Sequence, residues 1–228
     1  MKVIELNASV TESNDRDADA IRKEMKEKGT LLINLMSSPG SGKTTLLSRT
    51  ITDLKDQLSI GVMEADIASD VDAVKIESLG AASIQAHTDG MCHMDAGMTK
   101  RALDSIGYED KDLIFLENVG NLICPAEFDT GAGLKVMILS VPEGDDKPLK
   151  YPLMFEQSDA LVITKMDTLE YFDFSLDKCA ERASRLNPSI QIFPLSAKTG
   201  AGMNIFEEWL KEQVSAWKGE KSDTIFRD

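Results

Sequence analysis

Residues 31–45 read LLINLMSSPGSGKTT, and this stretch decides the fold. The apolar run from Leu31 to Met36 has the length of a buried β-strand. A short loop of serine, proline and glycine follows it, and a helical pattern starts at Lys43. A strand, a glycine-rich loop and a helix in this order, with Gly42 and Thr44 flanking the lysine, are typical of a phosphate-binding loop.

This loop predicts a triphosphate site built largely from backbone N–H groups. Such groups point into the concavity at a helix N-terminus, where the helix dipole attracts anions. We expect Lys43 to reach the β- and γ-phosphates and Thr44 to bind Mg²⁺. Ser37 replaces the first glycine of the pattern, and the alternative is a Gly/Ser-rich turn without a ligand. The predicted phosphate-binding residues are Gly40, Ser41, Gly42, Lys43, Thr44 and Thr45.

Beyond Gly29 the chain alternates short apolar runs with helical patterns. This alternation predicts an α/β fold of the P-loop NTPase class, with a mainly parallel sheet of about seven strands and helices on both faces. Residues 1–28 are expected to form a polar, solvated, amphipathic helical arm, and residues 29–228 the P-loop domain, which the base-side segments described below assign to the GTPases. The expected strands are 31–37, 59–66, 82–87, 112–119, 133–141, 159–166 and 190–196. The expected helices are 43–56, 69–79, 94–106, 148–157, 175–186 and 203–217, and residues 120–132 are expected to form a functional loop.

Composition excludes several classes of protein. The 228 residues carry a formal net charge of −14, which would repel nucleic acid and anionic membrane surfaces. No apolar run approaches the roughly 20 residues that span a bilayer, and the N-terminus lacks the pattern of a secretory signal. We therefore expect a cytoplasmic protein with no nucleic-acid or membrane partner. Three cysteines in a chain of this size favour reduced thiols over a disulfide framework.

Two further segments favour guanine as the base. TKMD at 164–167 follows the sixth expected strand, and SAK at 196–198 follows the seventh. They are similar to the N-K-x-D and S-A-K base-recognition segments of GTP-binding proteins, with Thr164 in place of Asn. The Asp167 carboxylate can accept both the N1–H and the N2–H of guanine, whereas adenine offers no such pair. The alternative for the first segment is a simple helix cap. The predicted base-side residues are Thr164, Lys165, Asp167, Ser196, Ala197 and Lys198.

The fourth expected strand ends in residues 117–120, which resemble a D-x-x-G switch with Glu in place of Asp. Glu117 would hold a Mg²⁺-bound water, and the Gly120 N–H would contact the γ-phosphate. Asn121 is shorter than the Gln that positions the attacking water in some GTPases, so we expect slow turnover by the monomer. The predicted catalytic residues are Lys43, Asp66, Glu117 and Gly120, and the predicted magnesium residues are Thr44, Asp66 and Glu117.

A third group of residues predicts a soft-metal site at the same edge of the sheet. Cys92 and His93 follow the third expected strand, and Cys124 lies four residues beyond Gly120. Two thiolates and an imidazole suit Zn²⁺ or Ni²⁺ and leave a fourth position open. The alternative is that the cysteines are small buried hydrophobes and the histidine a helix cap. Cys179, on an expected helix beside alanines, is assigned to the core.

Four segments together resemble one family, and the resemblance covers nearly the whole chain. They are residues 37–45, residues 90–96 (GMCHMDA), residues 117–125 (ENVGNLICP) and residues 143–152 (EGDDKPLKYP). The chain is similar in these segments to the hydrogenase maturation GTPases of the HypB family. The cysteine-bearing segments are more specific than the phosphate-binding loop.

The resemblance implies GTP hydrolysis coupled to nickel insertion into the NiFe hydrogenase large-subunit precursor, together with other nickel-maturation proteins. It also implies a GTP-promoted homodimer with a metal site at its interface, for which Cys92, His93 and Cys124 are the ligands. Residues 1–36 contain neither Cys nor His, so nickel storage by the arm is not expected.

Three alternatives remain open. The first is a urease-maturation GTPase, whose Cys-Pro-His type of site differs from the adjacent Cys92 and His93. The second is a zinc or nickel carrier that uses nucleotide only to set its oligomeric state and has negligible hydrolysis. An ATP-dependent kinase is disfavoured by Asp167 and by residues 196–198.

Overall fold

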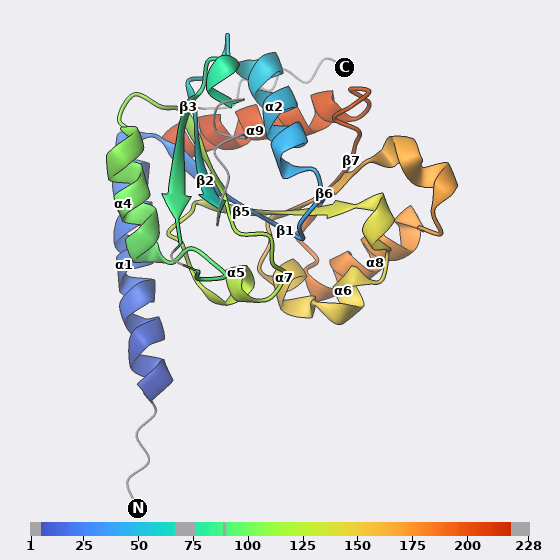
Figure 1. Cartoon of the computed structure of the whole chain (residues 1–228), viewed down its shortest axis with the longest axis horizontal. Coiled ribbons are helices and arrows are strands. Elements are labelled where there is room, and N and C mark those ends of the chain that lie inside the picture. The colour runs from blue at the N-terminus through green and yellow to red at the C-terminus, as the bar shows by residue number, and fades with distance from the viewer. Residues whose placement is uncertain (1–5, 67–75, 89, 220–228) are drawn as a thin grey trace, which may run out of the picture.

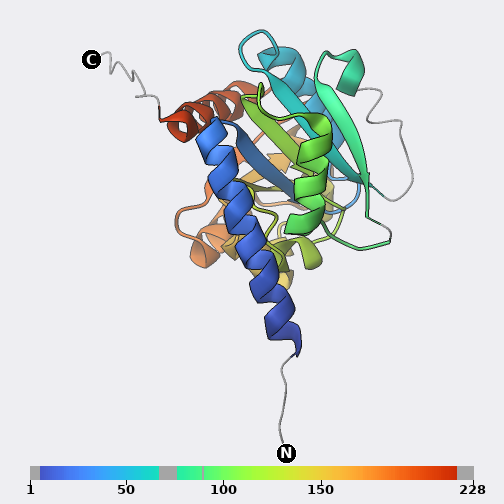
Figure 2. The same cartoon turned by 90° about the vertical axis from the view of Figure 1, so that its left-hand side faces the viewer.

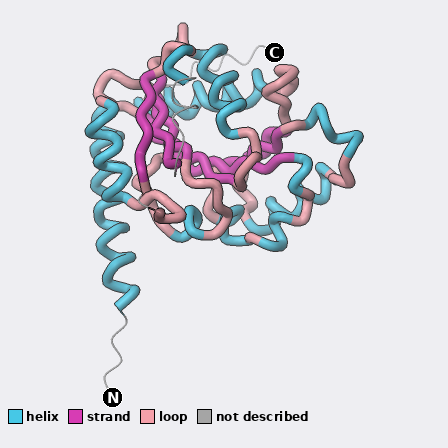
Figure 3. Tube along the Cα trace, in the orientation of Figure 1, coloured by secondary structure: helices cyan, strands magenta, loops and turns pink. Residues whose placement is uncertain are grey.

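The computed structural model of the chain describes residues 6–66, 76–88 and 90–219, although the side chains of residues 6–11 and 66 lie outside this description. Seven strands form one sheet in the order β3-β2-β4-β1-β5-β6-β7, and each neighbouring pair is parallel. Figure 3 shows this sheet between helices, which confirms the predicted α/β class. The strands are β1 (Leu31–Ser37), β2 (Ile60–Asp66), β3 (Ala82–His87), β4 (Leu113–Glu117), β5 (Leu134–Ser140), β6 (Ala160–Thr164) and β7 (Gln191–Pro194).

The central strand β1 is buried on both sides because its alternate residues face different helical layers. Leu31, Ile33 and Leu35 join the core beneath α2 (Lys43–Leu54) and α9 (Met203–Lys218). On the other face, Leu32 packs with α1 (Leu6–Lys28) and α4 (Ala96–Ile106). Two further helices, α7 (Pro152–Glu156) and α8 (Leu176–Leu186), cover that second face over β5 and β6 (Figure 1). This double coverage explains why β1 reads as a continuous apolar run.

All seven expected strands are present, and each observed strand equals or is shorter than its expected range. The helix expected over 148–157 is divided into α6 (Lys147–Lys150) and α7, because Pro152 has no N–H and disfavours the helical conformation at Tyr151. The functional loop contains the short helix α5 (Cys124–Glu127). Two 3₁₀ helices, η1 (Val141–Glu143) and η2 (Met166–Tyr171), were not expected. The helix expected over 69–79 falls mainly on residues 67–75, outside the described residues.

The N-terminal arm does form a helix, α1, but its second half is not solvated. Ala18, Ile21 and Met25 are buried in the core shared with α4, and Figure 2 shows α1 and α4 side by side. Arg22 adds an ion pair of 2.7 Å with Asp129, which belongs to the loop that follows β4. The expectation of a solvated arm therefore does not hold for this part, because the apolar stripe of the helix finds a partner face.

Within the described ranges, none of the helices combines the length and the apolar composition needed to cross a bilayer.

We predict that Gly131→Ala destabilises the fold strongly because α1 leaves no room at this position. Gly131 has φ +79°, and an added Cβ would lie 2.7 Å from the Ile21 Cβ and 2.9 Å from the Ala18 carbonyl oxygen. The left-handed backbone costs about 1–2 kcal/mol for alanine, and the overlap adds about 1–3 kcal/mol. Urea unfolding followed by circular dichroism measures the loss.

Gly219→Ala is the matched control, since Gly219 has φ +78° and its added Cβ meets nothing within 4 Å in the described chain. Equal losses for the two variants would contradict the close docking of α1.

Candidate functional site

The carboxyl ends of the strands carry a continuous trough formed by two adjoining hollows. One hollow, of about 460 Å³, is lined by Lys43, Thr44 and Glu117 among others. The other, of about 340 Å³, is lined by the base-side residues around Asp167 and Ser196. Gly42, Thr45 and Lys165 line both hollows. The trough thus joins the predicted phosphate-binding and base-binding residues, at the sheet edge where ligands of open α/β folds bind.

The phosphate-binding loop is held by a buried hydroxyl network centred on Ser37, the residue that replaces glycine. The Ser37 Oγ accepts hydrogen bonds from the Ser41 Oγ at 2.7 Å and the Lys43 Nζ at 2.9 Å, and it donates to the Ser38 carbonyl at 2.9 Å. A hydroxyl has one donor and two acceptor sites, so Ser37 uses its full capacity within the loop. The Lys43 ammonium also lies 4.0 Å from the Glu117 carboxylate.

Thr44 and Glu117 line the same hollow and offer a hydroxyl and a carboxylate, which are the hard oxygen donors that Mg²⁺ prefers. The backbone of Asp66 ends β2 beside His87, but its side chain lies outside the described residues. Thr44 and Glu117 could therefore hold a magnesium ion beside the predicted phosphate site, and the magnesium roles of Thr44, Asp66 and Glu117 all stay predictions.

Thr164 ties the base-side segment to the phosphate-binding loop. Its hydroxyl donates a buried hydrogen bond of 2.6 Å to the Ser41 carbonyl, and the neighbouring Lys165 Nζ donates to the Gly40 carbonyl at 2.7 Å. Lys165 has φ +59° and is the one described residue other than glycine with a positive φ. A strained backbone of this kind persists where its surroundings hold it, and it concentrates at functional sites.

Asp167 is oriented by a second hydroxyl. The Ser196 Oγ donates to the Asp167 Oδ1 at 2.6 Å, and the Lys198 Nζ lies 4.0 Å from Oδ2. Because Asp167 lines the hollow, this arrangement presents a fixed carboxylate to a base. A carboxylate accepts two N–H donors side by side, which is the pattern that guanine offers.

The switch segment after β4 lies directly against the phosphate-binding loop. A Cβ added to Gly120 would lie 3.0 Å from the Pro39 backbone nitrogen and 3.0 Å from its Cγ. Only glycine allows this approach without a shift of the loop. Gly120 thus lies at the contact between the phosphate-binding loop and the segment that leads to Cys124.

Cys92, His93 and Cys124 come together at the same edge. One potential ligand atom from each lies within 4.8 Å of the others, and the two sulfurs are 2.7 Å apart. Cys92 is exposed and Cys124 is partly exposed, so a bound ion would keep an open side. Two sulfurs and one imidazole nitrogen match the donor set of zinc and nickel sites.

The His93 ring is fixed by its surroundings. It stacks on Phe128 with a centroid distance of 3.8 Å, and its buried Nε2 has no hydrogen-bond partner among the described residues. Burial lowers the pKa of His93, although Asp95 and Glu127 oppose this effect. The imidazole is therefore neutral near pH 7, which is the state that binds a metal. The hydrogen bond with Cys124, followed by burial, raises the pKa of Cys92, so a bound metal must displace a thiol proton.

Cys179 stands apart from this cluster. It lies on α8 in the core, where burial raises the pKa of its thiol to about 12. The assignment of Cys179 to the core is confirmed.

Two residues that contact the loop of Cys92 and His93 had no predicted role in the sequence analysis. Phe128 stacks on His93, and Asn118 accepts a hydrogen bond from the Met94 backbone N–H at 3.1 Å. The sequence weakly indicates a special role for Asn118, because it is a polar residue at the end of an apolar strand. It contains no such indication for Phe128, since the contact of Phe128 with His93 depends on how the loop folds.

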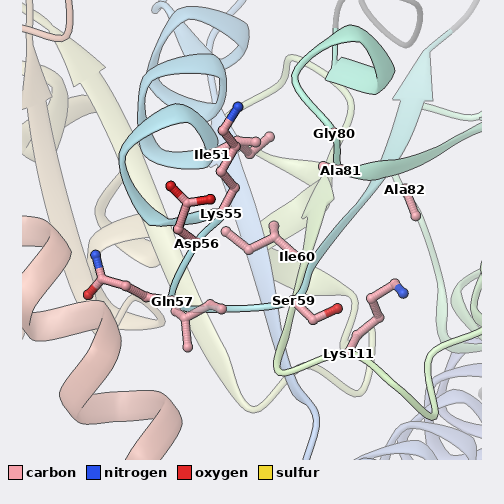
Figure 4. Close-up of a pocket in the computed structure, with 11 residues that line it drawn as sticks. Ile51, Lys55, Asp56, Gln57, Ser59, Ile60, Gly80, Ala81, Ala82 and Lys111 are labelled. Carbon is pink, nitrogen blue, oxygen red and sulfur yellow. The ribbon is translucent and has the colours of Figure 1, made fainter.

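A separate hollow of about 370 Å³ lies at the opposite, amino-terminal edge of the sheet (Figure 4). Ser59 and Ile60 line it where β2 begins, and Ala82 lines it where β3 begins. None of the predicted site residues belongs to it. We assign it no role, because ligands of parallel sheets gather at the carboxyl edge.

Comparison with known proteins gives consistent matches. The pattern of the family described as "CobW/HypB/UreG, nucleotide-binding domain" matches residues 31–194. The chain is 46% identical over 215 residues to the hydrogenase maturation factor HypB of Rhizobium leguminosarum bv. viciae, covering 94% of this chain and 71% of that protein. It is 41% identical over 201 residues to the hydrogenase/urease maturation factor HypB of Helicobacter hepaticus, covering 86% and 82%. The crystal structure of HypB from Helicobacter pylori in complex with nickel has a TM-score of 0.85 at 37% identity, covering 94% of this chain and 100% of that one.

We predict that Thr164→Val weakens GDP binding because the variant cannot hold the phosphate-binding loop to the base-side segment. A lost buried hydrogen bond costs about 1 kcal/mol, which corresponds to roughly fivefold in affinity. Thr164→Ser keeps the hydroxyl and should bind GDP within about twofold of the unmodified chain. Calorimetric titration with GDP compares the three proteins, and an unchanged affinity for the valine variant would contradict the role of this contact.

Proposed function

Because the chain belongs to the HypB family of hydrogenase maturation factors, within the CobW/HypB/UreG group of nucleotide-binding proteins, we propose that it is a GTP-hydrolysing metallochaperone that delivers nickel to NiFe hydrogenase precursors. The observation that carries the proposal is the double role of one segment. Residues 117–124 border the nucleotide trough at Glu117 and supply Cys124 to the thiol and imidazole cluster.

The nucleotide in this proposal is GTP. The carboxylate of Asp167, oriented by Ser196, is the group that selects guanine. Thr164 keeps the structural contact to the phosphate-binding loop but has no amide to offer to the base. Discrimination against ATP therefore depends mainly on Asp167.

Magnesium, bound by Thr44 and the carboxylate of Glu117, would neutralise phosphate charge during hydrolysis. The chain contributes the ammonium of Lys43 and the backbone N–H groups of the loop, which bind and orient the triphosphate. Gly120, beside Pro39, is the candidate contact for the γ-phosphate. These roles are proposed for the residues named from the sequence, including Asp66.

Nickel is the proposed cargo, and the Cys92, His93 and Cys124 cluster is its proposed carrier site. Met91 is 38% exposed and Ile123 is 55% exposed, so large apolar side chains adjoin the two thiols. Exposed apolar surface of this kind favours association with another protein. We propose that a second copy of the chain covers it in a GTP-dependent homodimer, and that the hydrogenase precursor and other nickel-maturation proteins are its further partners. We place this activity in the cytoplasm.

Nucleotide state and metal affinity are proposed to be coupled through the switch segment. A γ-phosphate that fixes Gly120 would also fix the path to Cys124 and so change its separation from Cys92 and His93. Linkage then requires that metal binding changes nucleotide affinity by the same factor.

A second candidate function is nickel delivery to urease, which the name of the Helicobacter hepaticus relative favours. Pull-down of maturation partners and precursors from cells that contain both nickel enzymes distinguishes the two cargo routes.

We predict that replacing both cluster cysteines by alanine lowers nickel affinity by at least 100-fold, because the double variant keeps only one of the three ligands. The chain provides a matched control in Cys179→Ala, which removes a buried core thiol of α8 that does not belong to the cluster. Equilibrium dialysis against nickel, with the bound metal quantified by elemental analysis, measures the affinity of both variants. Retained nickel binding in the Cys92→Ala/Cys124→Ala variant, or its loss in the Cys179→Ala variant, would contradict the proposed site.

We also predict slow GTP hydrolysis by the monomer, at least tenfold below the roughly 10 s⁻¹ that is typical of enzymes. The Asn121 Oδ1 accepts a hydrogen bond from the Ile123 N–H at 2.8 Å, and the Asn121 Nδ2 donates one to the Cys92 carbonyl at 3.4 Å. These bonds hold the Asn121 side chain against the loops that carry Cys92 and Cys124. Single-turnover hydrolysis should accelerate as protein concentration rises and dimers form. A fast rate that is independent of concentration would argue against this proposal, and the absence of phosphate release would favour the carrier without hydrolysis.

A further inference from the structure

Asn118 is a buried residue that lies between the predicted switch residue Gly120 and the loop that carries Cys92 and His93. Asn118 is 1% exposed and directly follows Glu117, the last residue of β4. Its backbone N–H donates to the Leu35 carbonyl of β1 at 3.0 Å. The Asn118 Nδ2 donates to the Asn34 Oδ1 at 3.0 Å, and the Asn118 Oδ1 accepts from the Val119 N–H at 2.9 Å and the Met94 N–H at 3.1 Å. One carboxamide therefore joins the central strand, the switch and the residue after His93.

The bond to Met94 fixes the loop that carries two of the three metal ligands. Met94 is 1% exposed, so its N–H has no access to water if the carboxamide is removed. A buried donor left without a partner costs more than an ordinary hydrogen bond contributes. Beyond Met94, Asp95 caps α4 by accepting from the Met98 N–H at 2.7 Å. Asn118 and this cap thus hold the loop from two sides immediately after His93.

The other end of the connection lies at the phosphate-binding loop. Gly120, two residues from Asn118, approaches Pro39 so closely that an added Cβ would lie 3.0 Å from the Pro39 nitrogen and force a small shift of the loop. Val119 lies between the two and donates its N–H to the Asn118 Oδ1. Two covalently linked residues and one hydrogen bond thus connect the Gly120 contact with the oxygen that accepts from Met94.

We propose that Asn118 is a positioning residue that sets the geometry of Cys92 and His93 and transmits the nucleotide state to them. The first role, positioning, rests on the proposed metal site of Cys92, His93 and Cys124, and the second, transmission, rests in addition on the proposed nucleotide coupling. The first concerns the nucleotide-free protein and stands on the hydrogen bonds of the carboxamide.

The Asn34 side chain makes a specific rescue possible. Its buried Nδ2 has no hydrogen-bond partner in the part of the chain that the structure describes. An aspartate at position 118 cannot donate to the Asn34 Oδ1, but a rotated Asn34 amide would donate its Nδ2 hydrogen instead. Asn118→Asp therefore keeps the acceptor for Met94 and Val119, whereas Asn118→Ala removes it.

The experiment is a nickel titration of the full chain without nucleotide, with GDP and with a non-hydrolysable GTP analogue. We expect Asn118→Ala to lower nickel affinity in the nucleotide-free protein by about 10-fold or more, as is usual when the groups that orient metal ligands are removed. We expect the ratio of affinities between the two nucleotide states to fall to about one. Asn118→Asp should recover most of both effects. If Asn118→Ala does not fold, Asn118→Ser, whose hydroxyl is too short to reach Met94, takes its place.

The outcomes separate the two claims. Nickel affinity of the alanine or serine variant within about twofold of the unmodified chain would overturn the positioning role. If the unmodified chain binds nickel equally in both nucleotide states, the coupling in the proposed function is wrong. The positioning role would then still be decided by the nucleotide-free titration. An unchanged ratio in a variant that has lost nickel affinity would overturn the transmitting role alone.

Discussion

The parallel pairing of β1 with β4 is the constraint on which the site depends. Leu35 of β1 is in register with Glu117 of β4, and the Asn118 N–H continues the ladder by one further bond to Leu35. β4 therefore ends two residues before β1, which continues to Ser37, and the phosphate-binding loop and the switch segment leave neighbouring strands at the same edge of the sheet. The contact between Gly120 and Pro39 follows directly from this register. A shift of one residue would turn Glu117 to the other face of the sheet.

Much of this architecture could be predicted because it depends on short-range patterns. Buried parallel strands are continuous apolar runs, and the glycine-rich loop between a strand and a helix has a distinct sequence, so all seven strands were placed correctly. The common edge of Cys92 and Cys124 also followed from topology. The packing of α1 could not be read in this way, because Ala18, Ile21 and Met25 are an ordinary helical stripe until a partner face is known.

The roles of polar residues at the site were harder to predict because they depend on distant contacts. Thr164 looked like a weakened base-recognition residue, but its hydroxyl binds the carbonyl of Ser41, a residue 123 positions away. Ser37 looked like a defect in the loop pattern, yet it completes a network with Lys43. In both cases the residue type was visible in the sequence and its partner was not. The predicted ligand and catalytic roles themselves stay predictions.

The central claim is that the nucleotide trough and the thiol and imidazole cluster influence each other through residues 117–124. The most direct test is the affinity of the unmodified chain for a non-hydrolysable GTP analogue, measured with and without nickel, alongside the nickel affinity with and without the analogue. Linkage predicts that both measurements change by the same factor, typically about 5-fold or more for coupled sites. Affinity for the analogue that is identical with and without nickel would contradict the account.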